Sequence, residues 1–233
     1  MPIPADDMTG IILPEIPGSL RQARLLYSVD AAQLAGLEAG GIVLPESLAN
    51  AMLKRQVEFA AGRFCAREAL QQLGCESRAT LAIGQDRVPL WPAGYLGSIS
   101  HGDGLAIAVV TTTKAWRGVG IDIERILTIE AAEPLVEHLM TAAELAIGNA
   151  AGLSLAHWLS LVFSAKESLF KALYPLVGRY FDFLDAEVCE LQKQQSCITL
   201  RLVTTLSPSC VKGSLYCVRY SCFSNNVATL CLL

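Results

Sequence analysis

The sequence predicts a mixed α/β (α+β) fold in two halves, each with a long helix packed against a small sheet. Three observations point to this class. Two long segments, 46–73 and 153–174, carry apolar residues at helical spacing. Short runs rich in Val, Leu, Cys and Tyr read as strands. Residues 114–118 interrupt the apolar pattern and mark a boundary, which predicts halves at 1–117 and 118–233.

The composition of the 233-residue chain is typical of a protein with much buried surface. Hydrophobic residues make up 52% and charged residues 17%. No apolar run approaches the roughly 18 residues that a membrane-spanning helix requires. The net charge of −4 argues against nucleic-acid binding, which needs a basic face. The acidic, Pro-rich N-terminus is unlike a secretory signal, so we expect a cytoplasmic protein.

The eight cysteines show no zinc-binding pattern. None forms a Cys-x-x-Cys pair, and the three histidines do not interleave with them at zinc spacing. In a cytoplasmic protein the simplest interpretation is free thiols that act as small apolar residues in buried strands. We therefore favour free cysteines over disulfides or a metal site.

The first half should hold one long helix and a few strands. Prolines punctuate residues 1–44, which we expect to be irregular with short strands. The helix at 46–73 follows a proline and should end at Gly74. Turn signals occupy 79–96, and the run 105–112 is continuously apolar, as in a strand buried on both faces.

The second half should begin with the strand 119–124. A helix then starts at Thr141-Ala-Ala-Glu144, which matches a capping box. The long helix at 153–174 is expected to stop at Pro175. Four strand-like runs, separated by Ser, Pro, Gly and Asn, complete this half: 184–191, 197–205, 214–222 and 227–232.

Two acidic residues share one face of the strand 119–124. Apolar residues alternate there with Gly120, Asp122 and Glu124, and side chains at i and i+2 point to the same side. The two Cα atoms would lie roughly 6.6 Å apart, so one divalent cation could bind both carboxylates. On this pattern alone, an exposed edge strand with ordinary surface acids is the simpler explanation.

The predicted helix 153–174 also carries charged side chains. Glu167 and Lys171 form an i,i+4 pair beside the apolar stripe, which alone predicts a surface ion pair worth about 0.2–0.5 kcal/mol. Lys166 falls near the centre of the stripe, where its ammonium group must reach water along its stem or meet an anion. Three carboxylates and two lysines from these two segments would together suit a pyrophosphate held by Mg²⁺.

A third polar segment, Gly97-Ser-Ile-Ser-His101, precedes the strand 105–112. Its glycines would let the backbone approach a ligand closely, although a lone His is more often structural than catalytic. No Gly-x-Ser-x-Gly elbow surrounds Ser100, so this segment does not indicate a hydrolase. On the first helix, Arg55 and Arg63 most simply form part of a solvated face.

Together these segments resemble the 4′-phosphopantetheinyl transferases, specifically the larger type that activates siderophore and other peptide synthetases. The matching segments run in order from about residue 55 to 187. They are 58–67 (EFAAGRFCAR), 87–94 (RVPLWPAG), 97–101 (GSISH), 119–124 (VGIDIE), 163–175 (FSAKESLFKALYP) and 181–187 (FDFLDAE).

The resemblance implies an intramolecular pseudo-dimer of two α/β halves, with coenzyme A between them and a monomer as the functional unit. It implies that three carboxylates ligate Mg²⁺, or Mn²⁺ in its place: Asp122, Glu124 and Glu167. It also implies that Lys166 and Lys171 act near the coenzyme A phosphates. The residues matching the nucleotide-binding set are Ser100 and His101, with Arg55, Arg63 and Arg87 toward the 3′-phosphate.

The implied reaction moves 4′-phosphopantetheine from coenzyme A to a serine of an acyl or peptidyl carrier protein and releases adenosine 3′,5′-bisphosphate. The metal and the lysines would offset charge on the leaving group. Glu167 is the expected general base, with a bound water or Glu124 as alternatives. Two other classes stay open on the residues: a Mg²⁺-dependent phosphohydrolase, and a coenzyme A- or carrier-binding module without catalysis.

Overall fold

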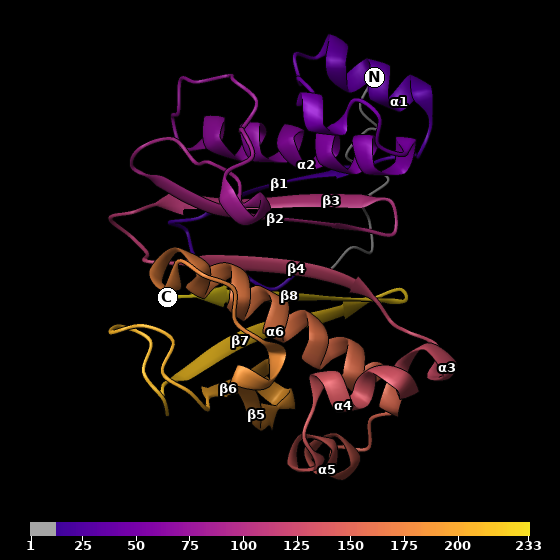
Figure 1. Cartoon of the computed structure of the whole chain (residues 1–233), viewed down its shortest axis with the longest axis vertical. Helices are drawn as coiled ribbons and strands as arrows, with labels where there is room; N and C mark the ends of the chain where they lie inside the picture. The colour runs from indigo at the N-terminus through magenta and orange to yellow at the C-terminus, as the bar shows by residue number, and fades with distance from the viewer. Residues whose placement is uncertain (1–12) are drawn as a thin grey trace. The chain divides into compact units, whose positions relative to one another are not determined.

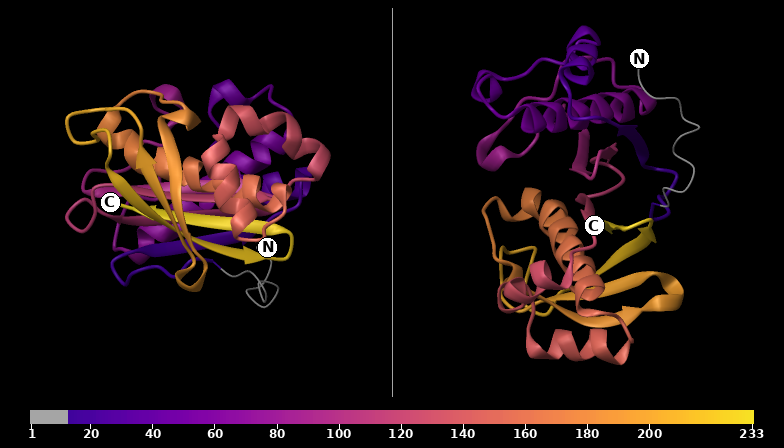
Figure 2. Two further views of the ribbon diagram at one scale, coloured as in Figure 1. Left: turned by 90° about the horizontal axis from the view of Figure 1, so that it is seen from below. Right: turned by 90° about the vertical axis from the view of Figure 1, so that its right-hand side faces the viewer.

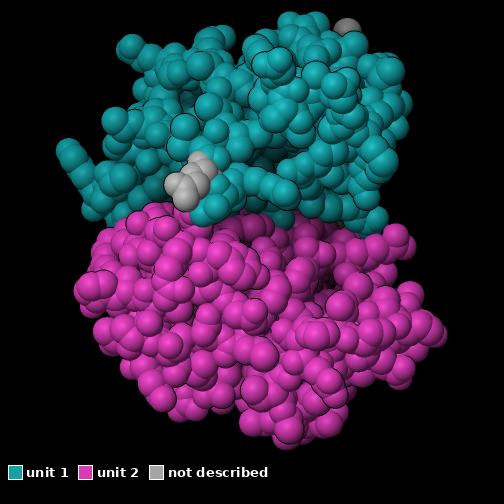
Figure 3. Space-filling view, in the orientation of Figure 1, with its two compact units in different colours: residues 1–9, 16–116 teal, residues 10–15, 117–233 magenta. Residues whose placement is uncertain are grey.

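The computed structural model describes residues 13–233, which form two units (Figure 3). The described part of unit 1 is 16–116, and that of unit 2 is 13–15 with 117–233. Each unit has its own sheet, long helix and hydrophobic core (Figure 1). The predicted mixed class is therefore confirmed. Within residues 13–233, no helix combines the length and apolarity needed to cross a membrane.

Unit 1 packs one long helix, α2 (Leu53–Gln72), against a three-stranded antiparallel sheet. The strands, in the order β1–β3–β2, are Arg21–Leu26, Leu105–Thr112 and Tyr95–Gly102. The buried face of α2 consists largely of Ala residues together with Cys65, and it packs against Ala106 and Ala108 of β3. Because these side chains are small, the helix can approach the sheet closely.

Several predictions for the first half are corrected by unit 1. The helix predicted over 46–73 begins only at Leu53, as α2. Ahead of it, residues 46–48 form a separate 3₁₀ turn, η2 (Glu46–Leu48). Residues 95–102 form strand β2, which was not predicted; turn signals were expected over 79–96, and 97–101 was noted only as a polar segment. The range 1–44 contains β1 and also a helix, α1 (Ala31–Ala39), whose N-terminus is capped by Asp30. Residues 1–12 of that range lie outside the described part.

Unit 2 consists of one sheet with helix α6 (Leu155–Val177) along one face (Figures 1 and 2). The sheet is fully antiparallel, and its order is β4–β8–β7–β6–β5. These strands span Val119–Arg125, Asn226–Leu232, Leu215–Phe223, Cys197–Leu202 and Ala186–Gln192. All five strands of this half were predicted, and the structure confirms them within a few residues.

Helix α6 was predicted to stop at Pro175, but it continues to Val177. Pro175 lies in the last turn, so the helix loses only the hydrogen bond that its missing N–H would donate. The helix ends at Gly178, which has a left-handed backbone (φ 69°) and donates its N–H to the Tyr174 carbonyl. The true stop signal is therefore the glycine.

Three helices connect β4 to α6. Helices α3 (Ile129–Ala132) and α4 (Val136–Leu139), joined by the turn η4 (Glu133–Leu135), were not predicted. Helix α5 (Ala142–Ala150) begins at the predicted capping box, which is confirmed. Thr141 N donates to Glu144 Oε2 at 2.7 Å, and Glu144 N donates to Thr141 Oγ1 at 3.3 Å. Three further 3₁₀ turns are η3 (Gln85–Arg87), η5 (Phe183–Asp185) and η6 (Lys193–Gln195).

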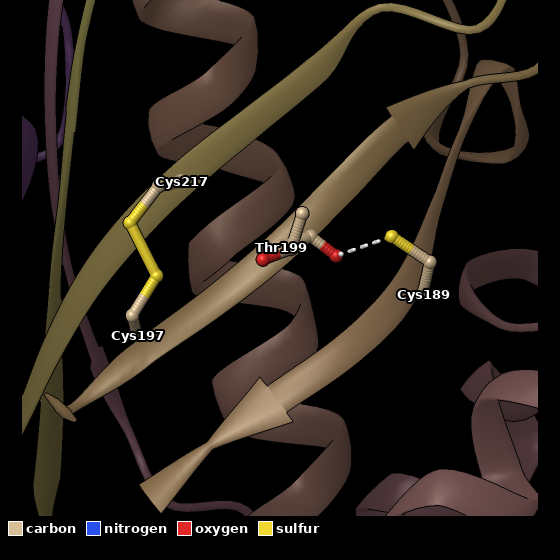
Figure 4. The surroundings of a disulfide bond; sticks show 4 residues. All are labelled: Cys189, Cys197, Thr199 and Cys217. Atoms are coloured by element: carbon tan, nitrogen blue, oxygen red, sulfur yellow. Dashed lines mark hydrogen bonds between the residues drawn. A yellow bond between two sulfur atoms is a disulfide. The ribbon is translucent and has the colours of Figure 1, made fainter. Parts of the chain in front are cut away.

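The expectation that all cysteines are free is wrong for one pair. A disulfide joins Cys197 on β6 to Cys217 on β7 (Figure 4). Cys217 lies directly opposite Thr199 in the β6–β7 register, so the two cysteines are diagonal neighbours, with Cα atoms 6.2 Å apart. This separation is within the range that a disulfide spans. The other six cysteines are free, among them Cys189, which contacts the Thr199 carbonyl.

Candidate active site

Asp122 and Lys171 join strand β4 to helix α6. Gly120 lies against the α6 backbone, so this face of β4 is directed toward the helix. Lys171 Nζ lies 2.6 Å from Asp122 Oδ1 and also donates to the Ile121 carbonyl at 3.1 Å. The Asp122 side chain is only 4% exposed and that of Lys171 26%. Asp122 is therefore not an ordinary surface acid, and Lys171 forms a tertiary ion pair.

Two further carboxylates belong to the same cluster. Burial raises the pKa of Glu124 to about 7, and the negative charges of Asp122 and Glu167 add to this rise, while Lys171 opposes it. Burial likewise raises the pKa of Glu167; Lys171 counteracts this and Asp122 reinforces it. The charges of Asp122, Glu124, Glu167 and Lys171 therefore interact with one another. We call Asp122, Glu124 and Glu167 the carboxylate cluster.

The chemistry of the carboxylate cluster fits a hard divalent cation. Its three acidic side chains outnumber the one ammonium group among them, and carboxylate oxygens are the ligands that Mg²⁺ and Mn²⁺ prefer. In the arrangement described, Lys171 neutralises Asp122. Within residues 13–233, no three His, Cys, Asp or Glu side chains form a ready-made metal site. The structure thus supplies the donor chemistry rather than a closed coordination shell.

Lys166 contacts a different set of partners from Lys171. Its Nζ lies 2.8 Å from Glu144 Oε1 and donates to the Leu139 carbonyl at 2.7 Å. The Lys166 side chain is 2% exposed and that of Glu144 0%. Burial lowers the pKa of Lys166, and the Glu144 carboxylate opposes that shift by favouring the ammonium form. Of the two possibilities raised by its place in the apolar stripe, Lys166 meets an anion.

A pocket beside the carboxylate cluster was not predicted. Its lining combines Lys166 and Glu167 with aromatic side chains of α6 and the segment after it. Phe170 has its ring centroid 4.9 Å from that of Phe181 and 5.5 Å from that of Tyr180. The other lining residues are Asp182, Phe183 and Ala186. The aromatic content of 180–183 was the available signal, but aromatic residues more often belong to a core.

In unit 1, the two predicted arginines of α2 have different surroundings. Arg63 is buried, at 6% exposure; its Nε donates to the Leu81 carbonyl at 2.8 Å, and its guanidinium lies 4.5 Å from the Phe59 ring centroid. Burial lowers the pKa of Arg63 to about 10, and the nearby positive charge of Arg55 contributes. Arg55 itself is exposed. The solvated-face interpretation therefore holds for Arg55 and is wrong for Arg63.

The other predicted residues of unit 1 are spread over two faces and a turn. Side chains alternate along β2, so the buried Ser100 and the part-exposed His101 point to opposite faces of the sheet. His101 Nδ1 lies 3.9 Å from Glu58 Oε2 on α2, and Lys54 Nζ lies 3.9 Å from the same carboxylate. Arg87 is exposed in the η3 turn, with a left-handed backbone (φ 64°).

Family models match both halves of the chain. Residues 44–111 match the 4′-phosphopantetheinyl transferase N-terminal domain, and residues 118–230 match the 4′-phosphopantetheinyl transferase superfamily. The chain therefore belongs to the 4′-phosphopantetheinyl transferase family and is an enzyme of that class. The resemblance drawn from the sequence motifs is confirmed.

Individual relatives agree with this family. The chain is 40% identical over 148 residues to enterobactin synthase component D of Escherichia coli K12, which covers 64% of this chain and 68% of the relative. It is 34% identical over 173 residues to the 4′-phosphopantetheinyl transferase PptT of Mycobacterium tuberculosis, with 73% and 75% covered. The 4′-phosphopantetheinyl transferase Svp of Streptomyces mobaraensis is 39% identical over 150 residues, with 63% and 61% covered.

Proposed function

We propose that this enzyme transfers 4′-phosphopantetheine from coenzyme A to a serine of an acyl or peptidyl carrier protein, requires Mg²⁺ and releases adenosine 3′,5′-bisphosphate. The observation that carries the proposal is the carboxylate cluster itself. Asp122 on β4 pairs with Lys171 on α6, and the charges of Glu124 and Glu167 interact with this pair, which supports the proposal. Mn²⁺ would substitute for Mg²⁺, since both accept oxygen ligands.

The residues of the carboxylate cluster divide the chemical work. Asp122, Glu124 and Glu167 would hold the cation, which when bound polarises the pyrophosphate and offsets charge on the leaving group. Lys171 supplies a positive charge at the phosphates, and its contacts with Asp122 and the Ile121 carbonyl fix its position. Lys166 is left out of this phosphate-binding set, because its ammonium group already contacts Glu144 and Leu139.

The proton of the carrier serine passes to a carboxylate. A new bond forms between the serine Oγ and the β-phosphorus of coenzyme A, and the bond from that phosphorus to the departing bisphosphate breaks. Glu167 is the proposed base, and because binding to the cation would make it a weaker proton acceptor, two alternatives stay open. Glu124 and a bound water are the alternatives.

The arginines of α2 are proposed to bind the 3′-phosphate of coenzyme A. Arg63 has a rigid setting between the Leu81 carbonyl and the Phe59 ring, and Arg55 provides a second, exposed cation nearby. A phosphate would offset the repulsion between these two cations and could accept paired hydrogen bonds from a guanidinium. Ser100, His101 and Arg87 are proposed as further contacts of the nucleotide.

Replacing Arg55 by Ala should reveal this phosphate contact. We expect KM for coenzyme A to rise about tenfold, as for loss of a charge-assisted hydrogen bond, and KM for 3′-dephospho-coenzyme A to stay unchanged. Arg55 is exposed, so the melting temperature should also stay the same. Lys54→Ala, which removes the exposed neighbouring cation, is the matched control and should change neither KM. An equal loss with both substrates would remove Arg55 from the 3′-phosphate site.

Mass spectrometry of an apo-carrier incubated with the enzyme and coenzyme A tests the whole function. With Mg²⁺ present, we expect the carrier to gain one phosphopantetheine, and EDTA should abolish the gain until Mg²⁺ is restored in excess. A phosphohydrolase would release phosphate without labelling the carrier. A binding module would retain coenzyme A and the carrier unchanged. Either of these results would refute the proposed transfer.

The proposed setting is a monomeric, cytoplasmic enzyme that serves carrier-protein pathways. One relative is named as a component of enterobactin synthase, which supports carriers of siderophore and nonribosomal peptide synthesis as partners. Fatty acid and polyketide carriers are the other candidates. Incubating the enzyme with purified carriers of each class, and comparing kcat/KM, would rank them.

A further inference from the structure

Glu144 connects three elements of unit 2 through one buried carboxylate. Its Oε2 accepts hydrogen bonds from the Thr141 backbone at 2.7 Å and from Thr141 Oγ1 at 3.1 Å, which close the N-terminus of α5. Its Oε1 accepts from the Val188 N–H of β5 at 2.8 Å. The same oxygen lies 2.8 Å from Lys166 Nζ of α6. The capping box explains only the first of these contacts.

Lys166 completes a buried polar link between α6 and the segment ahead of α5. Its ammonium group also donates to the Leu139 carbonyl at the end of α4. Both charged groups are almost fully buried, so the position of each depends on the other. On the next residue of the helix, Glu167 belongs to the carboxylate cluster, and Lys171 follows one turn later. A rotation of α6 about its axis would therefore break the Lys166 contacts and displace both active-site groups.

We infer that Glu144 is a positioning residue for the transfer reaction: by holding Lys166, it fixes the rotation of α6 that directs Glu167 and Lys171 toward β4. In this role Lys166 neutralises Glu144 and does not bind the coenzyme A phosphates. The inference rests on the proposed functions of Glu167 and Lys171. It adds a residue, Glu144, that touches neither substrate nor carrier.

The energetics of buried ion pairs distinguish this role from direct phosphate binding. Removal of one partner leaves an uncompensated buried charge, and the surrounding elements shift to relieve it. Removal of both charges by side chains of similar volume is much less disruptive. A lysine that only neutralises Glu144 therefore becomes dispensable when Glu144 is neutral. A lysine that binds phosphate stays essential whatever residue occupies position 144.

A double-mutant cycle tests the inference with Glu144→Gln, Lys166→Met and the double variant. We expect each single variant to lower kcat by about tenfold or more, as for a small displacement of catalytic groups, with KM for coenzyme A within about twofold of wild type. The double variant should have a higher kcat than either single variant, but not the full wild-type kcat, because the new glutamine offers one acceptor oxygen to the N–H groups of Thr141 and Val188 and the Leu139 carbonyl loses its donor. Activities are compared well below each melting temperature, so that the fraction folded does not enter kcat.

Lys193→Met is the matched control. Lys193 also donates to a backbone carbonyl, that of Ala151, but it is exposed, so its loss should leave kcat unchanged. If Lys166→Met does not fold, a folded and active double variant with an unchanged KM for coenzyme A supports the inference.

A double variant as inactive as Lys166→Met, with a raised KM for coenzyme A, would overturn the inference and assign Lys166 to the phosphates. The proposed function has a separate test. Wild-type kcat in Glu167→Gln would refute the role of the carboxylate cluster, whatever the outcome of the cycle at Glu144 and Lys166.

Discussion

Replacing Asp122 by Asn is expected to lower kcat for phosphopantetheine transfer by at least about a hundredfold, as for loss of a charged group that stabilises the transition state. Asp122 belongs to the carboxylate cluster and pairs with Lys171 at 2.6 Å. The substitution removes a ligand charge for the cation and the negative charge that neutralises Lys171. Asn keeps the size of the side chain and an oxygen that accepts from Lys171, so the fold should persist.

Two measurements make this prediction specific. Mg²⁺ should raise the melting temperature of the wild-type enzyme, because a ligand that binds only the folded state stabilises it, and it should not raise that of Asp122→Asn. Glu190→Gln, which neutralises an exposed acid on β5 of the same sheet, is the control and should keep both the activity and the Mg²⁺ response. An Asp122→Asn enzyme with wild-type kcat would contradict the assignment of the metal site.

Replacing Gly120 by Ala is expected to destabilise unit 2 by about 3 kcal/mol or more. Strand β4 meets helix α6 backbone to backbone at this position, and an added Cβ would overlap the Ser168 carbonyl oxygen. The atoms that the added Cβ would overlap belong to the main chain of α6, so the clash cannot be relieved by a change of side-chain rotamer. The midpoint of urea unfolding, followed by the near-ultraviolet signal, measures the loss.

Gly36→Ala provides the comparison, because Gly36 lies within helix α1 and an added Cβ there meets nothing within 4 Å. That substitution should leave stability unchanged or raise it by about 0.5 kcal/mol, since alanine favours helix. An unfolding midpoint for Gly120→Ala equal to that of the wild type would show that β4 and α6 are not in backbone contact.

Much of unit 2 could be predicted because its sequence obeys simple periodicities. The four C-terminal strands are apolar runs separated by turn residues, and the structure confirms them. Strand β2 was missed because Gly97, Ser98 and Ser100 have little intrinsic preference for strands. They become a strand by pairing with β3. The Cys197–Cys217 disulfide was missed for a similar reason, since the register of β6 and β7 decides which cysteines are neighbours.

The candidate site shows the same division between local and tertiary information. The i,i+2 spacing of Asp122 and Glu124 and the off-stripe position of Glu167 indicated a shared site from the sequence. The partner of Lys166 was not foreseen, because Glu144 already had a sufficient role in a capping box and lies on a different helix. Burial of Arg63 was also missed, since its contact with the Leu81 carbonyl depends on how α2 packs.

The glycine-mediated approach of β4 to α6 also bears on protein engineering. Because the main chains of β4 and α6 are in direct contact, their relative position is fixed by that contact. The acidic strand grafted alone into another scaffold would therefore lack the geometry that pairs Asp122 with Lys171. Strand and helix would have to be transplanted together, with the glycine retained. A library that varies the segment between them should keep the carboxylate at position 144 wherever Lys166 is retained, because the two side chains form a buried ion pair.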